Sequence, residues 1–199
     1  MRAAVRNPGS ALPSRTYRGQ PGRRVVRPRP QIRTDEPMNG APIFRNTRLD
    51  AAENERLHDL AAAGAAAFGY TAELKLDRDL ARLLRLRVAQ LNNCSYCLVV
   101  HHAAARDSGI NPIKIETLTS WWETGLFSDA EQAALAYAEA LTRAADATAS
   151  QDFQQVHERM AEHFDDEERL EIVGVVINMN IWTRLKLAEG ARPGLDDER

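Results

Sequence analysis

NNCSYCLVVH, residues 92–101, holds both cysteines of this 199-residue chain. On a helix that starts at the first cysteine, Cys94 and Cys97 share one face, and His101 follows on that face one turn after Cys97. Asn92 and Asn93 favour an N-cap position, so we expect the helix to begin here. Its free N–H groups and positive dipole end would favour a thiolate over a thiol. The stretch therefore predicts two-electron thiol chemistry at a helix start.

Helical patterns extend outward from this stretch on both sides, and no convincing alternating strand appears from residue 50 onward. Apolar residues recur with helical spacing, and glycines and capping residues mark the ends of the segments. The expected helices cover residues 50–68, 77–91, 95–108, 112–123, 128–145 and 150–163, with a last helix opening at 165. The run 172–182 is apolar almost all round, so it should be buried. Seven helices with short connections predict an all-α helical bundle.

Residues 1–37 differ in composition from the rest of the chain. They hold nine arginines and six prolines against two acidic residues, and they show almost no apolar periodicity. This composition predicts a disordered basic, proline-rich extension. We favour an extension without a selected function, with the true start near Met38. An arm that binds nucleic acid or an anionic surface is the alternative, whereas the prolines argue against the amphipathic helix of a transit peptide.

The bulk composition excludes several classes of protein. Hydrophobic residues make up 44% and charged residues 27% of the chain, as in ordinary soluble domains. No apolar run approaches the ~20 residues that span a bilayer, and no apolar segment of a secretory signal follows the N-terminal charges. A C-x-x-C pair in such a chain indicates redox or metal chemistry rather than a structural disulfide. We expect a cytoplasmic protein with no membrane segment and no nucleic-acid partner.

The residues around the cysteines resemble a known family. RLRVAQLNNCSYC at residues 85–97, followed by His101, is similar to the alkylhydroperoxidase AhpD-like proteins of the carboxymuconolactone decarboxylase superfamily. The likeness continues with Arg106, Gly109, Trp122, Phe127, Ser128, residues 131–142, Phe164, Glu168 and residues 180–184. It implies an AhpD-like helical domain over residues 45–190.

The resemblance also implies a function, that of a thiol-dependent hydroperoxide reductase with an antioxidant, peroxidase-like activity. Cys97, in the position of the family's attacking cysteine, would become a sulfenic acid, and Cys94 would condense with it to a disulfide. An external dithiol, such as a lipoyl or thioredoxin-like protein, would reduce the pair. His101 matches the family's proton-relay histidine. The resemblance further implies a homo-oligomer, a trimer or hexamer, and no cofactor is expected.

The chain departs from the family pattern at one position. The family's relay glutamate usually stands twelve residues before the first cysteine, where this chain has Arg82. An arginine cannot act as a base at neutral pH, although its charge can stabilise a thiolate. Asp79, on about the same helix face, could replace the carboxylate or simply pair with Arg82. The alternative function is therefore a non-catalytic or sensor-type helical oligomer with weak peroxidase activity.

Other interpretations of the site residues stay open. Tyr96 could line the pocket or donate a hydrogen bond to peroxide. Zinc prefers four ligands, or three and a water, and the cysteine pair with His101 supplies only three. Inert packing and a metal site are therefore minor alternatives, and no metal is expected.

We expect His102 at the surface or an interface. Glu139 should bond an internal partner such as Arg184.

Overall fold

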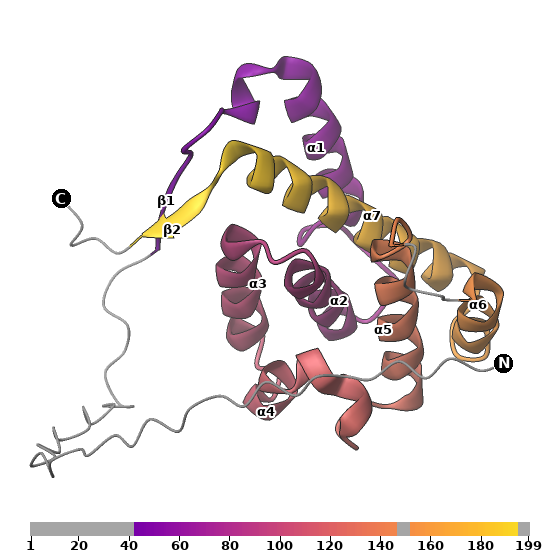
Figure 1. Cartoon of the computed structure of the whole chain (residues 1–199). Helices are drawn as coiled ribbons and strands as arrows, with labels where there is room; N and C mark the ends of the chain where they lie inside the picture. Colours follow the sequence, from indigo (N-terminus) through magenta and orange to yellow (C-terminus); the bar gives the residue numbers. More distant parts are fainter. Residues whose placement is uncertain (1–41, 147–151, 195–199) are drawn as a thin grey trace, which may run out of the picture. The chain divides into compact units, whose positions relative to one another are not determined.

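The computed structural model describes residues 42–146 and 152–194, so the predicted extension at residues 1–37 lies outside the described residues. The fold is an all-α bundle, as predicted, with one short strand at each end (Figure 1). Its elements are β1 (Ile43–Arg45), the 3-10 helix η1 (Ala51–Glu53), α1 (Glu55–Phe68), α2 (Arg78–Leu91), α3 (Ser95–Asp107), α4 (Pro112–Glu116), the 3-10 helix η2 (Leu118–Glu123), α5 (Asp129–Thr142), α6 (Phe153–Ala161), α7 (Asp166–Glu189) and β2 (Arg192–Gly194).

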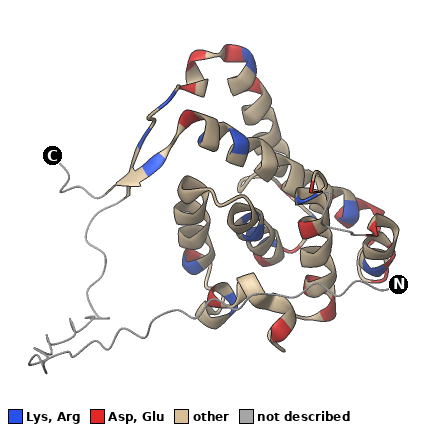
Figure 2. Cartoon of the chain, viewed as in Figure 1, with Lys and Arg blue, Asp and Glu red and all other residues tan. Residues whose placement is uncertain are grey.

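Helix α2 forms the centre of the bundle. It packs against α3, α5 and α7, which surround it in Figure 1. Asp77 begins the helix, because its carboxylate accepts hydrogen bonds from the N–H groups of Asp79 and Leu80. Apolar side chains on several faces of α2 are buried, each worth ~1.5–3 kcal/mol relative to exposure. Figure 2 shows that this central helix also carries basic residues, and two of them, Arg85 and Arg87, are buried.

Arg87 is neutralised by a buried acidic partner on α5. Its Nε donates to Glu139 Oε1 at 2.7 Å, and the same carboxylate oxygen accepts from Trp121 Nε1 at 2.7 Å. The prediction that Glu139 bonds an internal partner is confirmed, but the partner expected from sequence, Arg184, is wrong. Arg184 instead donates to Asn180 within α7. The Arg87–Glu139 pair therefore joins α2 to α5 inside the core.

Replacing Glu139 by glutamine is expected to destabilise the fold by about 3–5 kcal/mol, because it leaves the buried Arg87 cation without an opposite charge. Urea unfolding followed by circular dichroism measures this free energy. The matched control is the double variant Arg87→Met, Glu139→Leu, which removes both charges and should lose less than the single variant. A loss below about 1 kcal/mol for Glu139→Gln would contradict the assigned role.

Two features of the described fold were not expected. The predicted helix over residues 112–123 divides into α4 and η2, because the Thr117 hydroxyl bonds the Ile113 carbonyl at the end of α4, and Ser120 leaves helical geometry inside η2. The strands β1 and β2 pair antiparallel, with Ile43 opposite Gly194. Strands of three residues that pair across the whole domain carry no local alternating pattern.

The paired ends are fastened to the C-terminal end of α7. The N–H groups of Thr47 and Arg48 donate to the Glu189 carbonyl at 3.1 and 3.0 Å. The Glu189 carboxylate accepts from the Ala51 N–H at 3.0 Å, and the Thr47 hydroxyl donates to the Gly190 carbonyl. Gly190 ends α7 with φ of +63°, a left-handed conformation that favours glycine. The beginning and the end of the described chain are thereby held together.

Helix α7 follows Asp165, where the last helix was expected to open, and it begins with a capping box between Asp165 and Glu168. The prediction that its run 172–182 is buried all round is wrong for one face, where Ile177 is 49% exposed. Gly174 allows the close approach of α1 on another face, because a Cβ there would overlap the Phe68 ring. Within the described residues, no helix combines the length and hydropathy needed to cross a bilayer.

Candidate active site

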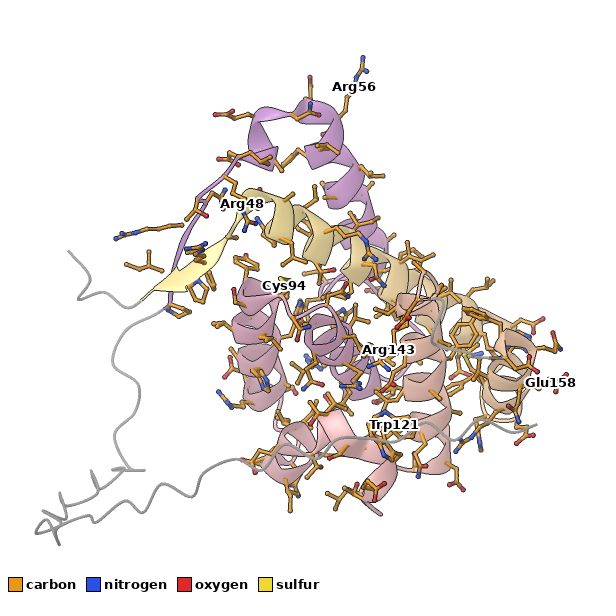
Figure 3. The ribbon with its side chains drawn as sticks, in the orientation of Figure 1. Arg48, Arg56, Cys94, Trp121, Arg143 and Glu158 are labelled. Carbon is orange, nitrogen blue, oxygen red and sulfur yellow. A yellow bond between two sulfur atoms is a disulfide. The ribbon has the colours of Figure 1, made fainter. Side chains whose placement is uncertain are left out.

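The two cysteines lie at the first turn of α3. Helix α2 ends at Asn92, and Asn93 turns the chain with a left-handed φ of +50°. Cys94 is the N-cap of α3, because its Sγ accepts the Cys97 N–H at 3.3 Å. The helix start predicted from sequence is confirmed, but the N-cap expected at Asn92 or Asn93 is wrong. Figure 3 labels Cys94 at this end of α3, where α3 lies close to α7.

The cysteines are joined in a disulfide within one chain. Their Cα atoms lie 5.2 Å apart, and both side chains are almost fully buried. They differ in what they face: Cys97 lines a cavity of about 310 Å³, and Cys94 is not among the lining residues. The two cysteines therefore differ in that only Cys97 borders the cavity.

The cavity lies between α1, α2, α3 and α7. Its apolar wall includes Val100, Met179 and Trp182, and Tyr96 closes one side. The Tyr96 ring packs against Phe44 of β1, with ring centroids 4.3 Å apart. Polar groups also line the cavity, namely Tyr70, Thr71, Arg85, His101, Asn178 and Lys186. The reactive turn therefore borders a mainly apolar chamber with a few polar groups, the usual composition of a small-molecule site.

His101 is held in place by a residue that the sequence did not indicate. Its Nδ1 lies 2.5 Å from the Tyr70 hydroxyl, and the two rings stack with centroids 5.7 Å apart. Burial, together with the positive charge of Arg85 and the neighbouring His102, lowers the pKa of His101 to about 4. Burial raises the pKa of Tyr70, against the opposing effects of Arg85 and Arg82. At neutral pH the pair is therefore an uncharged imidazole bonded to a phenol.

The lowered pKa of His101 predicts a pH dependence of stability. The folded protein keeps this ring neutral down to about pH 4, whereas in the unfolded chain it takes a proton near pH 6.5. Between these values the unfolded chain binds more protons, so the free energy of unfolding should fall as the pH falls from 6.5 to 4, by up to about 3 kcal/mol for this residue. Urea unfolding of the wild type and His101→Asn over this window measures the contribution.

As the pH falls from 6.5 to 4, the free energy of unfolding should decrease less in His101→Asn than in the wild type. His102 is the comparison residue, since burial and the charge of Arg106 also lower its pKa. His102→Asn should therefore flatten the profile in the same direction. Equal slopes in His101→Asn and the wild type would show that His101 is not kept neutral by the fold.

Arg85 is a second residue at the cavity that the sequence did not single out. Its Nη2 donates to the carbonyls of Phe68 and Gly69 at 2.7 and 3.0 Å, and so satisfies the C-terminal end of α1. Its guanidinium lies 4.7 Å from the centroid of the Tyr70 ring. It is 3% exposed, and burial lowers its pKa. Arg85 therefore brings a positive charge to the cavity wall beside the Tyr70–His101 pair.

The structure does not bring Arg82 and Asp79 to the cavity. They pair with each other at 3.1 Å, which was one of the two roles considered for Asp79. Arg82 borders a small separate hollow beside Tyr70, and neither residue is among those that line the cavity with Cys97. The position that faces the cavity is one turn further along α2, at Arg85. Periodicity alone could not decide which turn of a helix that is buried on several faces reaches the thiols.

The described part of the chain places no metal-binding cluster beside the cysteines. Among residues 42–146 and 152–194, no group of three or more His, Cys, Asp or Glu side chains is placed to hold a metal ion. His102 lies partly buried rather than fully at the surface, and its Nδ1 is buried without a hydrogen-bond partner.

The fold and the paired cysteines define a helical-bundle protein with a cysteine pair beside a cavity, and comparison with known proteins gives its family. Residues 57–140 match the model of the carboxymuconolactone decarboxylase family. The uncharacterized protein YdfG of Bacillus subtilis is 30% identical over 123 residues, which cover 62% of this chain and 82% of YdfG. This chain belongs to the carboxymuconolactone decarboxylase family, as its resemblance predicted, and its fold is AhpD-like.

Solved structures share the fold. A protein of unknown function from Agrobacterium tumefaciens, provisionally described as the antioxidant defence protein AhpD, superposes with a TM-score of 0.64 at 24% identity. The match covers 72% of this chain and 95% of that protein. The debrominase Bmp8 superposes with a TM-score of 0.59 at 19% identity, over 74% of this chain and 90% of Bmp8. The fold thus occurs in proteins described with different chemistries.

Proposed function

We propose that this protein is a thiol-dependent hydroperoxide reductase in which Cys97 attacks, Cys94 resolves and His101 transfers protons. The observation that carries the proposal is that Cys97 lines the cavity while Cys94 lies outside its lining. A substrate in the cavity can therefore approach Cys97, the second cysteine, which matches the attacking cysteine of the family that the chain resembles. The first cysteine is close enough to close the disulfide that the structure contains.

The proposed cycle has three balanced steps. The Cys97 thiolate attacks one peroxide oxygen, the O–O bond breaks, and the leaving oxygen takes a proton to become an alcohol or water, which leaves Cys97 as a sulfenic acid. The Cys94 thiol then attacks the Cys97 sulfur and releases water, which gives the disulfide. An external dithiol reduces this disulfide by exchange and leaves as its own disulfide. Two electrons pass from the dithiol to the peroxide in each cycle.

The Tyr70–His101 pair provides the proton transfers that this cycle needs. His101 is neutral at pH 7, so it can accept the proton of the Cys97 thiol and return it to the leaving oxygen. The Tyr70 hydroxyl forms a hydrogen bond with the Nδ1 atom of His101 and thereby orients the imidazole ring. In this proposal Tyr70 takes the place of the family's relay glutamate as the partner of the histidine, so Arg82 need not supply a base.

Peroxide consumption under turnover conditions tests the proposal. The protein is supplied with hydrogen peroxide or cumene hydroperoxide and with one of several reductants: dihydrolipoamide, reduced thioredoxin or dithiothreitol. An enzyme should consume many equivalents of peroxide per protein. Oxidation that stops after one equivalent with every reductant would contradict the proposal and favour the sensor-type alternative.

Because a dithiol cycle needs a supply of reductant, we place this activity in a cytoplasmic, reducing compartment.

We further propose that the chain assembles into a homo-oligomer through the exposed face of α1 and α7. Leu170 and Ile177 of α7 are 69% and 49% exposed, and they border an apolar hollow with Gly64 and Phe68 of α1. A contiguous apolar surface of this kind is typical of subunit contacts. Trimeric or hexameric assembly remains the expectation from the resemblance.

Replacing Ile177 by glutamate should reduce the oligomer to a monomer, because a charge at a dry contact is costly to bury. Light scattering at micromolar concentration should give a multiple of 22.2 kDa for the wild type and about one subunit mass for the variant. Trp122, which is 52% exposed on η2, is the control position, and Trp122→Glu should leave the mass unchanged. A wild-type mass near that of one subunit would rule the oligomer out.

A further inference from the structure

The cavity next to Cys97 has an unusual charge balance. Two cationic residues, Arg85 and Lys186, line it, and none of its lining residues is acidic. His101 adds no charge at neutral pH, because its pKa lies near 4. The chamber is therefore apolar in most of its wall and positive in its polar part.

The two cations differ in how they are neutralised. Lys186 Nζ lies 2.7 Å from Glu189 Oε2, so a carboxylate balances its charge. Arg85 forms no ion pair with any residue of the described chain, although it is only 3% exposed. Carbonyl oxygens at the end of α1 satisfy its Nη2, and its Nε is buried without an acceptor. A buried cation without a partner is costly, and a bound anion would offset that cost.

Asn178 of α7 is a second unpaired polar group at the same cavity. Its side chain is 4% exposed and makes no hydrogen bond with another described residue, and its Oδ1 is buried without a partner. A Cβ on Gly64 would come within 2.8 Å of this oxygen, so Oδ1 lies directly against α1. The Nδ2 group is then the polar atom of Asn178 that can serve a ligand. Arg85 and Asn178 both offer N–H donors, so the ligand group that suits them is an acceptor.

We propose that the cavity binds a small substrate with a carboxylate on an apolar body, and that Arg85 and Asn178 donate hydrogen bonds to this carboxylate. The apolar body would lie against Met179, Val100 and Trp182. Arginine suits this task because its planar fork matches a carboxylate. The identity of the reacting group rests on the proposed function. If that function holds, the substrate is a hydroperoxy acid. It is reduced to the corresponding hydroxy acid, and the carboxylate is unchanged.

A pair of unreactive probes of nearly equal shape tests the binding site. Calorimetry with the full chain in its disulfide form at pH 7 compares 3-phenylpropanoate with 3-phenylpropanamide. The acid should bind about tenfold or more tightly than the amide, since a hydrogen bond to a charged group is among the stronger ones. Equal binding of acid and amide would overturn the proposal.

Variants of two neighbouring arginines on α2 assign the effect to Arg85. Arg85→Gln should abolish the preference for the acid, and Arg85→Lys should retain part of it. Arg82→Gln is the matched control, because Arg82 pairs with Asp79 outside the cavity, and it should keep the full preference. Loss of the preference in Arg82→Gln but not in Arg85→Gln would contradict the assignment. Thermal melts show whether each variant is folded, and the wild-type comparison does not depend on any of them.

Turnover separates this inference from the proposed function. The kcat/KM for a hydroperoxy acid should exceed that for its methyl ester by a similar factor, and the difference should lie mainly in KM. If both are reduced at equal efficiency and the probes bind equally, the carboxylate site is wrong while the reductase stands. If the acid probe binds preferentially and neither hydroperoxide is reduced, the reductase is wrong while the carboxylate site stands.

Discussion

Cys97→Ser is expected to abolish peroxide consumption, because serine removes the sulfur that the cavity presents to a substrate. Cys94→Ser should also stop turnover with a dithiol, since the disulfide can no longer close. The two variants should differ in what accumulates. Cys94→Ser should leave a sulfenic acid on Cys97 after peroxide treatment, because nothing resolves it. Cys97→Ser should leave no stable oxidised sulfur at an early time, since Cys94 is not among the residues that line the cavity.

Dimedone labelling followed by peptide mass spectrometry distinguishes these states. The label should be found on the Cys97 peptide of the Cys94→Ser protein and be absent from the Cys94 peptide of the Cys97→Ser protein. The wild type should instead lose two hydrogens and form no crosslinked dimer. Labelling of Cys94 in place of Cys97 would show that the two roles are exchanged. Intermolecular disulfides as the main wild-type product would contradict the resolving role of Cys94.

Tyr70→Phe is expected to lower peroxide turnover by about 10²-fold, the lower part of the range for losing a general acid–base contribution. The change removes only the hydroxyl that bonds His101 Nδ1 and keeps the ring under the Arg85 guanidinium. Without this bond His101 loses its preferred tautomer and orientation. Stopped-flow measurement of the first oxidation of the reduced protein isolates this step from the later reduction by dithiol. The pH profile of that step should also shift, which a purely structural change would not cause.

Tyr96→Phe is the matched control, because it makes the same chemical change at another tyrosine that lines the same cavity. Tyr96 contacts Phe44 and Lys186 through its ring, so loss of its hydroxyl should have little effect.

Asp79→Asn tests the carboxylate that the sequence suggested as a replacement for the family's glutamate. Full activity in Tyr70→Phe, combined with a large loss in Asp79→Asn, would return the relay role to Asp79 and refute the one assigned to Tyr70.

The helices could be predicted from sequence because their signals are local. Ser128 and Glu131 form a capping box at the start of α5, and Gly109 follows α3 with a positive φ of 84°, so both are capping signals that neighbouring residues carry. The cysteine turn was likewise predictable, since its geometry depends on residues four apart at most. The short strands were not predictable, because β1 and β2 pair across about 150 residues and neither has a pattern of its own.

The partners of the reactive residues depended on the three-dimensional arrangement. Tyr70 reaches His101 across 31 positions, and it lies just after the glycine that ends α1, where no motif marks it. Arg85 was part of the stretch that resembles the family, yet its position on a helix buried on several sides concealed its role. The error at Glu139 has the same origin, because Arg87 and Arg184 were both available basic partners and only packing selects Arg87.

The pairing of β1 with β2 gives the domain the connectivity of a nearly closed ring. Ile43 and Gly194 face each other, and Glu189 binds the segment that follows β1. A short glycine-rich linker could therefore join the two ends, and a new start could be opened at the exposed Asn111, after the buried Ile110 and before Pro112. Such a circular permutant would leave the cysteine turn, Tyr70 and the cavity-lining residues uncut, so its chemistry should match that of the natural chain order.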